Sequence, residues 1–297
     1  MIPFVRDLDF TYGVADQVSP LIRRVVANNP GPFTFRGTGT YIVGKGEVAV
    51  IDPGPDLPEH LDAILAATRG ETITTILVTH NHADHSPLAL PLKQRTGALT
   101  YGCPWSHKPL KAAVKMEDDE DEGFIADIKV CDGATISGPG WTFEAIPTPG
   151  HTSNHICYAL AEENCLFSGD HIMGWSTTVI TPPDGDMGAY YESLRRIRER
   201  NFSTLWPTHG PPITAPGPFI DAYYAHRLER ERQITAQLAA GRQRITDMVP
   251  EMYAAVDPRP HPAAAQSVLA HMIHLVRSGK VATDDPAPGL GSHYRLT

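Results

Sequence analysis

With 297 residues the chain is longer than a typical single domain, so we expect one large domain with a smaller appendage. A content of 41% hydrophobic and 20% charged residues is typical of an ordinary globular protein. The formal net charge of -9 speaks against a general nucleic-acid binder, although the residues after 225 are mildly basic while the rest of the chain is acidic.

The amino-terminal stretch MIPFVRDLDF is interrupted by charges and lacks the apolar core of a signal peptide, and no later stretch approaches membrane-spanning length. We therefore expect a cytoplasmic protein with no membrane partner. The cysteines lie too far apart for a Cys-x-x-Cys motif. We expect free, buried thiols at Cys103, Cys131, Cys157 and Cys165.

Strand and helix patterns alternate in the first part of the chain. A β-hairpin is predicted where residues 38–43 and 47–52 flank the sequence GKG. After it the pattern predicts a helix that stops at Gly70, a strand, a second helix and another strand, over residues 57–70, 74–79, 86–97 and 98–102. Such alternation favours an α/β architecture.

A strand-rich run follows, and the texture changes after it. The predicted strands cover residues 134–137, 142–148, 155–162, 165–169 and 203–210, with a helix over 187–200 before the last of them. This repeated plan suggests two layered halves that face each other. Three further helices, over 219–241, 244–256 and 262–281, predict a small helical unit. We place the boundary within 216–225, which gives domains 1–220 and 221–297.

The sequence THNHADH, residues 79–85, follows the apolar run ITTILV and contains four potential metal ligands. His80 and His82 are two residues apart, so at the end of an extended strand both can point toward one metal. Asp84 and His85 come where the chain must turn toward the next helix, and they suit a second metal beside the first. Loops at the carboxyl ends of strands are where open α/β proteins place their ligands.

One loop cannot complete two coordination spheres, and three later candidates again follow apolar strands. They are His151 after FEAI, Asp170 after CLF and His209 after TLW, each with a glycine beside it. Glycine lets the backbone approach a metal without a side-chain clash. Isolated histidines would be unremarkable, but this recurrence predicts a shared metal site.

These residues in this order resemble the ligand set of the metallo-β-lactamase superfamily. The resemblance implies a four-layer αββα sandwich in the α/β class. It implies a first metal held by His80, His82 and His151, a second held by Asp84, His85 and His209, and Asp170 as the bridge between them. Asp52, in AVIDPG, resembles the buried aspartate that supports the ligands in this family.

The ligand types indicate the metals and the chemistry. A site of three histidines suits Zn²⁺, whereas a site with carboxylates also tolerates Mn²⁺ or Fe, so we expect two Zn with Mn or Fe as alternatives at the second position. Two such ions can share a bridging hydroxide that is a nucleophile at neutral pH. Asp84 is the candidate catalytic residue that would orient it. His155 and His171 flank ligand motifs and either orient ligands or have a structural role.

The segments TPGHTSNH, LFSGDHIMGWSTTV and AHRLERERQI, followed by the helical tail, resemble the β-lactamase-like protein 2 group. That resemblance implies a winged-helix-like carboxyl-terminal domain and cleavage of single-stranded RNA. Alternatives are a glyoxalase-II-like thioesterase or another small-ester hydrolase and, last, a nucleic-acid or partner binder without activity. An antibiotic-degrading lactamase is disfavoured, because cysteine more often bridges the metals there and no signal peptide is expected. The oligomeric state is left open.

Two charged stretches bear on the choice of substrate. Residues 117–122, EDDEDE, predict a solvated loop, but they would repel RNA phosphates if they faced the site mouth. The residues expected to hold an RNA strand are Arg195, Arg196, Arg198 and arginines of the tail. The mixed charges of RLERER, residues 227–232, are interpreted as a salt-bridged helix surface.

Overall fold

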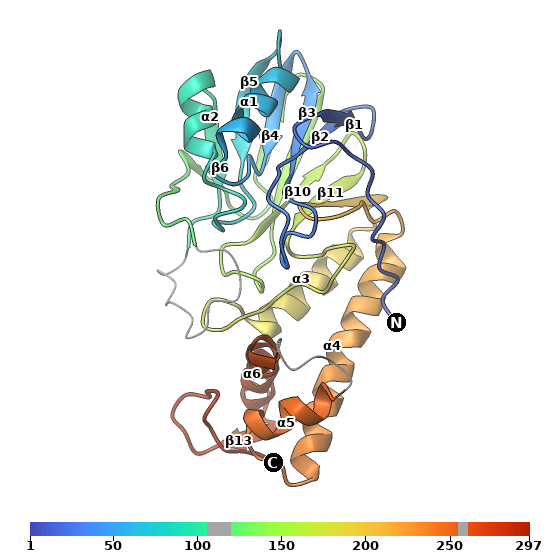
Figure 1. Ribbon diagram of the computed structural model, residues 1–297, viewed down its shortest axis with the longest axis vertical. Helices are drawn as coiled ribbons and strands as arrows, with labels where there is room; N and C mark the ends of the chain where they lie inside the picture. Colours follow the sequence, from blue (N-terminus) through green and yellow to red (C-terminus); the bar gives the residue numbers. More distant parts are fainter. Residues whose placement is uncertain (106–119, 255–260) are drawn as a thin grey trace.

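The computed structural model describes residues 1–105, 120–254 and 261–297. Within these residues, seven strands form one sheet in the order β1 to β7 (Figure 1). Their bounds are Ala15–Gln17, Ile22–Val26, Gly39–Lys45, Glu47–Ile51, Thr72–Leu77, Leu99–Gly102 and Ile128–Lys129. Strands β1 to β4 pair antiparallel, and β4 to β7 pair parallel. The predicted hairpin is β3–β4, which turns at positive-φ Gly44 and Gly46.

The second sheet follows the predicted strand-rich run. In the described part of the chain it has five strands in the order β12-β11-β10-β9-β8. From β8 to β12 their bounds are Thr135–Gly138, Trp141–Pro147, Ile156–Leu160, Cys165–Gly169 and Thr204–Pro207. Only the pair β11–β12 is parallel among these strands, because α3 (Met187–Glu199) forms the crossover between them.

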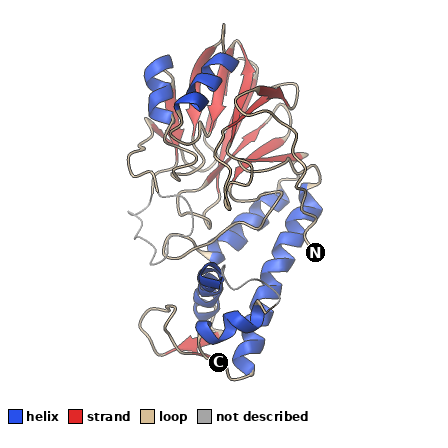
Figure 2. Ribbon diagram, viewed as in Figure 1, coloured by secondary structure: helices blue, strands red, loops and turns tan. Residues whose placement is uncertain are grey.

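The two sheets pack face to face with helices on both outer faces, which confirms the four-layer αββα sandwich (Figure 2). Alternation along the strands explains the layers. Tyr41, Ile51 and Leu77 belong to the cluster between the sheets, whereas Ile42 and Val50 belong to the cluster under α1 (Pro58–Ala67) and α2 (Ala89–Thr96). Helix α3 and the first turns of α4 (Pro216–Ala239) cover the second sheet.

The carboxyl-terminal unit has its own core. It joins the second half of α4, α5 (Ile245–Met252), α6 (His261–Arg277) and the antiparallel pair β13–β14 (Val281–Thr283 and Tyr294–Leu296). Helix α4 runs without interruption past the expected boundary. Its Tyr223 packs in the core under the second sheet, and its Ile234 packs in the carboxyl-terminal core. One helix therefore belongs to both units (Figure 1).

The structure also shows what the sequence patterns missed. Strands β1 and β2 were not predicted, because IRRVV in β2 contains two arginines that mask its apolar inner positions. The tail was expected to be helical, and the strands β13 and β14 complete it. Cys157 and Cys165 are buried free thiols as expected, but Cys131 is exposed and Cys103 is half-buried. No helix within the described ranges is long and apolar enough to cross a membrane.

Candidate metal centre

The predicted ligands come together at one end of the two sheets, on loops that follow β5, β9, β11 and β12. Three groups have inward ligand atoms that all lie within 4.8 Å of one another. The groups are His80 with His82 and His151, His80 with His85 and Asp170, and Asp84 with His85 and His209. All seven sequence-predicted ligands are therefore neighbours in the structure.

The first group consists of three imidazole nitrogens. The Nε2 atom of His80 lies 2.9 Å from Nδ1 of His82, and Nε2 of His151 lies 3.3 Å from that same Nδ1 atom. The three rings come from two loops, one after β5 and one after β9, and His151 is 69 residues from His82 in the chain. This arrangement matches the expected three-histidine group.

The second group combines imidazoles with a carboxylate. The Nε2 atom of His209 lies 2.9 Å from Oδ2 of Asp84, and Nε2 of His85 lies 3.4 Å from it. Asp170 lies between the groups. Its Oδ1 is 3.5 Å from His209 Nε2, and its Oδ2 is 3.9 Å from His151 Nε2. This is the position expected of a bridging carboxylate.

The outer nitrogen of each ring determines which tautomer can point inward. His151 Nδ1 donates to the carbonyl oxygen of Val179 at 2.7 Å, and His209 Nδ1 donates to that of Gly37 at 3.2 Å. A carbonyl oxygen can only accept, so Nδ1 carries a proton, and in the neutral ring it is Nε2 that offers a lone pair to a metal. His85 reaches the same state through the carboxylate of Asp52, 2.9 Å from its Nδ1. The inward nitrogens of these rings are thus prepared to bind a cation.

Asp52 connects the strands that carry the ligands. Asp52 directly follows β4 and has a positive φ of 46°; it accepts from the backbone N–H and the hydroxyl of Thr79, both at 2.8 Å. It also accepts from the hydroxyl of Thr208 at 2.8 Å and from His85. Thr79 in turn contacts His80 Nδ1 at 3.0 Å. One buried carboxylate therefore orients ligands from two loops, as the resemblance implied.

The histidines beside the ligands differ in role. His155 Nδ1 faces the hydroxyl of Thr148 at 2.8 Å, and its Nε2 accepts from the backbone N–H of Asp170 at 3.2 Å. It therefore holds the backbone of Asp170 in place. His171 is fully buried, and its ring packs on Tyr190 with centroids 5.0 Å apart. Burial lowers the pKa of His171 to about 3, so its ring is a neutral packing group.

The glycines next to the ligands serve neighbouring side chains. A Cβ atom on Gly150 would lie 2.6 Å from the Cα of Tyr190, and one on Gly169 would lie 2.6 Å from Nε2 of His155. Both residues also have positive φ, at 145° and 51°. From the sequence we expected these glycines to let the backbone approach a metal. In the structure, the absence of a side chain leaves room for Tyr190 beside Gly150 and for His155 beside Gly169.

Burial sets the protonation of two rings of the three-histidine group, His80 and His82. It lowers the pKa of His80 well below the ordinary value and that of His82 to about 3. Neighbouring imidazoles lower both further, because a second positive charge cannot be accommodated nearby. These rings are therefore neutral near pH 7, which is the state that binds metals.

The carboxylates of the site, in contrast, are held in their charged form. Burial alone would raise the pKa of Asp84, but His85 and His209 hold it well below its ordinary value. Asp170 is shifted downward in the same way. Both carboxylates are ionised, and His85 Nε2 and Asp170 Oδ1 have no hydrogen bond among the described residues. Buried anions and buried polar atoms without hydrogen bonds require a partner, and divalent cations fit this donor set.

The acidic segment meets the ligand loop. Residues 117–119 lie outside the described residues, but Glu120 forms a β-bridge with His82. The backbone N–H of Asp121 donates to the carbonyl of Asn81 at 2.7 Å, and its carboxylate accepts from Ser86 at 2.7 Å. Glu120 and Asp121 therefore lie against the ligand loop and form an acidic wall beside it, whereas Glu122 is exposed, as expected for a solvated loop.

The arginines expected to hold RNA are paired with carboxylates. Arg195 lies 2.9 Å from Glu192 and 2.8 Å from Glu199. The partners of Arg196 and Arg198 are Asp132 and Asp221. Their charge is thus largely compensated within the domain. In RLERER, Arg232 and Glu229 form the expected ion pair at 2.8 Å, but the interpretation as a helix surface was wrong for Arg227 and Glu231, which are buried.

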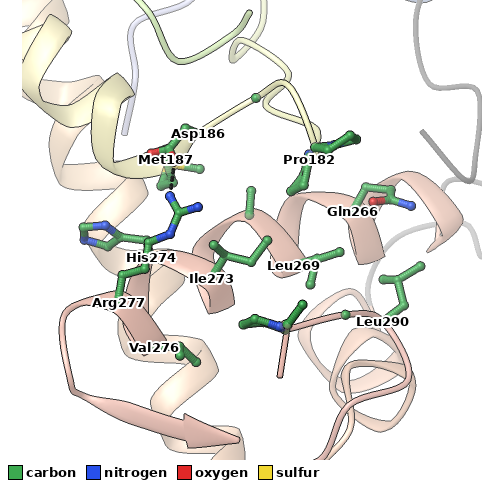
Figure 3. Close-up of a pocket in the computed structure, with 16 residues that line it drawn as sticks. Pro182, Asp186, Met187, Gln266, Leu269, Ile273, His274, Val276, Arg277 and Leu290 are labelled. Carbon is green, nitrogen blue, oxygen red and sulfur yellow. Dashed lines mark hydrogen bonds and ion pairs between the residues drawn. The ribbon is translucent and has the colours of Figure 1, made fainter. Parts of the chain in front are cut away.

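A pocket of about 550 Å³ lies where the two units meet (Figure 3). Leu269 and Ile273 of α6 line it, together with Leu290 and with Pro182 from the loop before α3. Figure 3 shows the ion pair between Arg277 of α6 and Asp186, the residue before α3, at the rim. The loop before α3 also contacts a predicted ligand, since the carbonyl of Val179 accepts from His151 Nδ1.

Comparison with known proteins identifies the family. A model of the metallo-beta-lactamase superfamily matches residues 34–209, more than half of the chain. The chain belongs to the metallo-beta-lactamase superfamily. A model of the beta-lactamase associated winged helix domain matches residues 245–287, which contain α5, α6 and β13. The protein is therefore a metal-dependent hydrolase with a winged-helix domain.

Individual relatives agree with this assignment. A beta-lactamase-like protein 2 homolog from Caenorhabditis elegans is 36% identical over 224 residues, which are 74% of this chain and 71% of the relative. An atrochrysone carboxyl ACP thioesterase from Aspergillus chevalieri is 35% identical over 235 residues, 77% of this chain and 69% of the relative. A beta-lactamase domain protein from Burkholderia ambifaria shares the fold, with a TM-score of 0.77, 17% identity and coverage of 98% and 96% of the two chains.

Proposed function

We propose that this metallo-beta-lactamase superfamily hydrolase cleaves a small thioester or a related ester. The observation that carries the proposal is the charge around the metal centre. Glu120 pairs through its backbone with His82, and the next acidic residue, Asp121, pairs with Asn81 of the same ligand loop. A polyanion is bound by uncompensated Lys and Arg, so an acidic wall disfavours RNA and favours a substrate with little negative charge. The ACP thioesterase among the relatives supports the same substrate class.

We assign His80, His82 and His151 to the first metal, and Asp84, His85 and His209 to the second, with Asp170 shared. Zn²⁺ suits the three-histidine position, and Zn²⁺, Mn²⁺ or Fe suits the second. Bound there, the two ions would activate water and polarise the scissile carbonyl. The ionised carboxylate of Asp84, 2.9 Å from His209 Nε2, gives the site an inward hydrogen-bond acceptor that could orient a water molecule. Asp52 and the carbonyls of Val179 and Gly37 keep the imidazoles in the metal-binding tautomer.

Cleavage of single-stranded RNA is the second candidate. It is favoured by the winged-helix domain, whose part of the chain is mildly basic, and by the beta-lactamase-like protein 2 homolog among the relatives. It needs a path for phosphates past the acidic wall, and it needs arginines other than the paired ones of α3.

The test is a parallel assay of purified protein on an N-acetylcysteamine thioester and on a single-stranded RNA oligonucleotide. We expect thioester turnover that a chelator abolishes and that Asp84→Asn removes, with RNA uncut. Metal-dependent RNA cleavage that Asp84→Asn abolishes, without thioester turnover, would reverse the assignment. The double variant Glu120→Gln, Glu122→Gln separates the cases further. It should leave thioester turnover unchanged but speed the cleavage of any RNA substrate.

A further inference from the structure

Helix α4 contacts the loop of residues 170–179. This loop begins at the ligand Asp170 and ends at Val179, whose carbonyl supports the ligand His151. Two side chains of α4, one helical turn apart, bind this loop. The hydroxyl of Tyr223 donates to the carbonyl of Met173 at 2.8 Å and contacts that of Ser176. The guanidinium of Arg227 donates to the carbonyl of Thr178. The loop is thus held from a helix that continues into the winged-helix domain (Figure 1).

The contact made by Arg227 leads directly to two ligands. The hydroxyl of Thr178 reaches the carbonyl of Asp170 at 2.8 Å, so it fixes the backbone from which that carboxylate extends. The next residue, Val179, accepts the Nδ1 proton of His151 at 2.7 Å. A displacement of the Thr178 peptide would therefore disturb the bridging carboxylate and one imidazole together.

Stability alone does not explain an arginine here. Arg227 is only 4% exposed, and it forms no ion pair with any carboxylate in the described part of the chain. Its guanidinium lies over the ring of Tyr190, 5.4 Å from the centroid, and Tyr190 donates to the carbonyl of His171 at 2.8 Å. A buried charge without a carboxylate partner is costly. An apolar side chain could pack on Tyr190 without that cost, but it could not hold the Thr178 carbonyl.

We infer that Arg227 is a positioning residue for the metal centre: it acts from α4, through the loop of residues 170–179, on Asp170 and His151. The inference rests on the proposed metal centre. It means that the metal centre depends on the shared helix α4 as well as on the loops of the hydrolase domain. Helix α4, which the hydrolase domain shares with the winged-helix unit, therefore contributes to metal binding without contributing a ligand.

The test compares Arg227→Met with Arg230→Met in the full chain. Arg230 lies on the same helix but contacts Gln233 and the ring of Tyr253, away from the loop. We expect zinc affinity to fall 10- to 100-fold in Arg227→Met, the range seen when groups behind metal ligands are removed. The absorption spectrum of the cobalt-substituted protein should change as well. Arg230→Met should match the wild type in both, and Arg227→Lys, which keeps a donor, should recover part of the affinity.

Thr178→Val keeps the test decisive if Arg227→Met folds poorly. It removes the hydroxyl that transmits the contact to Asp170, and it should weaken zinc binding in the same way. In the double variant Arg227→Lys, Thr178→Val the losses should be less than additive, because both act through one contact chain. Wild-type zinc affinity and an unchanged cobalt spectrum in Arg227→Met would overturn the inference. If Arg227→Met does not fold, the same result in Thr178→Val would overturn it. A wild-type protein that binds no zinc or cobalt would instead overturn the proposed metal centre itself.

Discussion

The two sides of the metal centre are supported in different ways. On the strand side, His80 and His85 follow β5, and their support, Asp52, directly follows the neighbouring strand β4. On the loop side, Asp170 and His151 depend on a loop held from α4, a helix more than 40 residues later in the chain. Strand-side support is therefore part of the sheet, whereas loop-side support depends on how two units pack. Loss of the first should cost folding and metal together, and loss of the second mainly metal.

The largest effect is expected where the two sides meet. Asp170→Ala removes the carboxylate between the groups, so bound metal should fall from about two ions per chain to below one, and thioester turnover should fall to the level of chelated protein. Elemental analysis after gel filtration measures the metal. His171→Asn, at a buried position beside the site, is the control. Metal retained at the wild-type level in Asp170→Ala would contradict the bridging assignment.

Removal of the strand-side support should affect both stability and metal. Asp52→Ala leaves Thr79, Thr208 and His85 without their acceptor. We expect a loss of roughly 3 kcal/mol in the free energy of unfolding, and zinc affinity about 10- to 100-fold weaker. Urea unfolding of the metal-free protein and zinc titration measure the two effects. A metal-free protein as stable as the wild type would show that the sides do not differ as described.

Loss of a single hydrogen bond to Asp52 should lower the stability less than loss of its carboxylate. Thr208→Val removes one buried hydroxyl donor, which contributes about 1 kcal/mol to the free energy of unfolding. Zinc affinity should change little, since His85 keeps its own contact with Asp52. Urea unfolding with and without zinc measures this. An equal loss of zinc affinity in Thr208→Val and Asp52→Ala would mean that Thr208, not the carboxylate, orients the site.

The smallest effect is expected at the surface between the units. Arg277→Ala removes the ion pair with Asp186 at the pocket rim, where the Arg277 side chain is 66% exposed. Exposed pairs contribute less than about 1 kcal/mol, so stability should hardly change, and zinc binding should not change. A marked loss of zinc in Arg277→Ala would show that the loop side is coupled to the winged-helix unit through α6 as well as α4.

Much of the site could be predicted because its ligands belong to short motifs at strand ends. THNHADH places four ligands directly after β5, and His151, Asp170 and His209 each follow an apolar strand. The supports were harder to find. Thr79 and Thr208 look like ordinary strand residues, and Arg227 lies in a stretch whose alternating charges are typical of an exposed helix. Their roles depend on contacts between segments that are far apart in the chain.

The sequence by itself determined the layers, through the alternation of apolar residues along the strands, and it indicated the seven candidate ligands, through their positions after strands and their resemblance to the ligand set of the superfamily. Only the tertiary structure decided which surroundings those ligands have. It placed Glu120 against His82, paired the arginines of α3 with nearby carboxylates, and buried Arg227 behind the loop of residues 170–179. The physical reason is that local patterns govern which face of an element is buried. The partner of a buried or charged group is set by packing between distant segments.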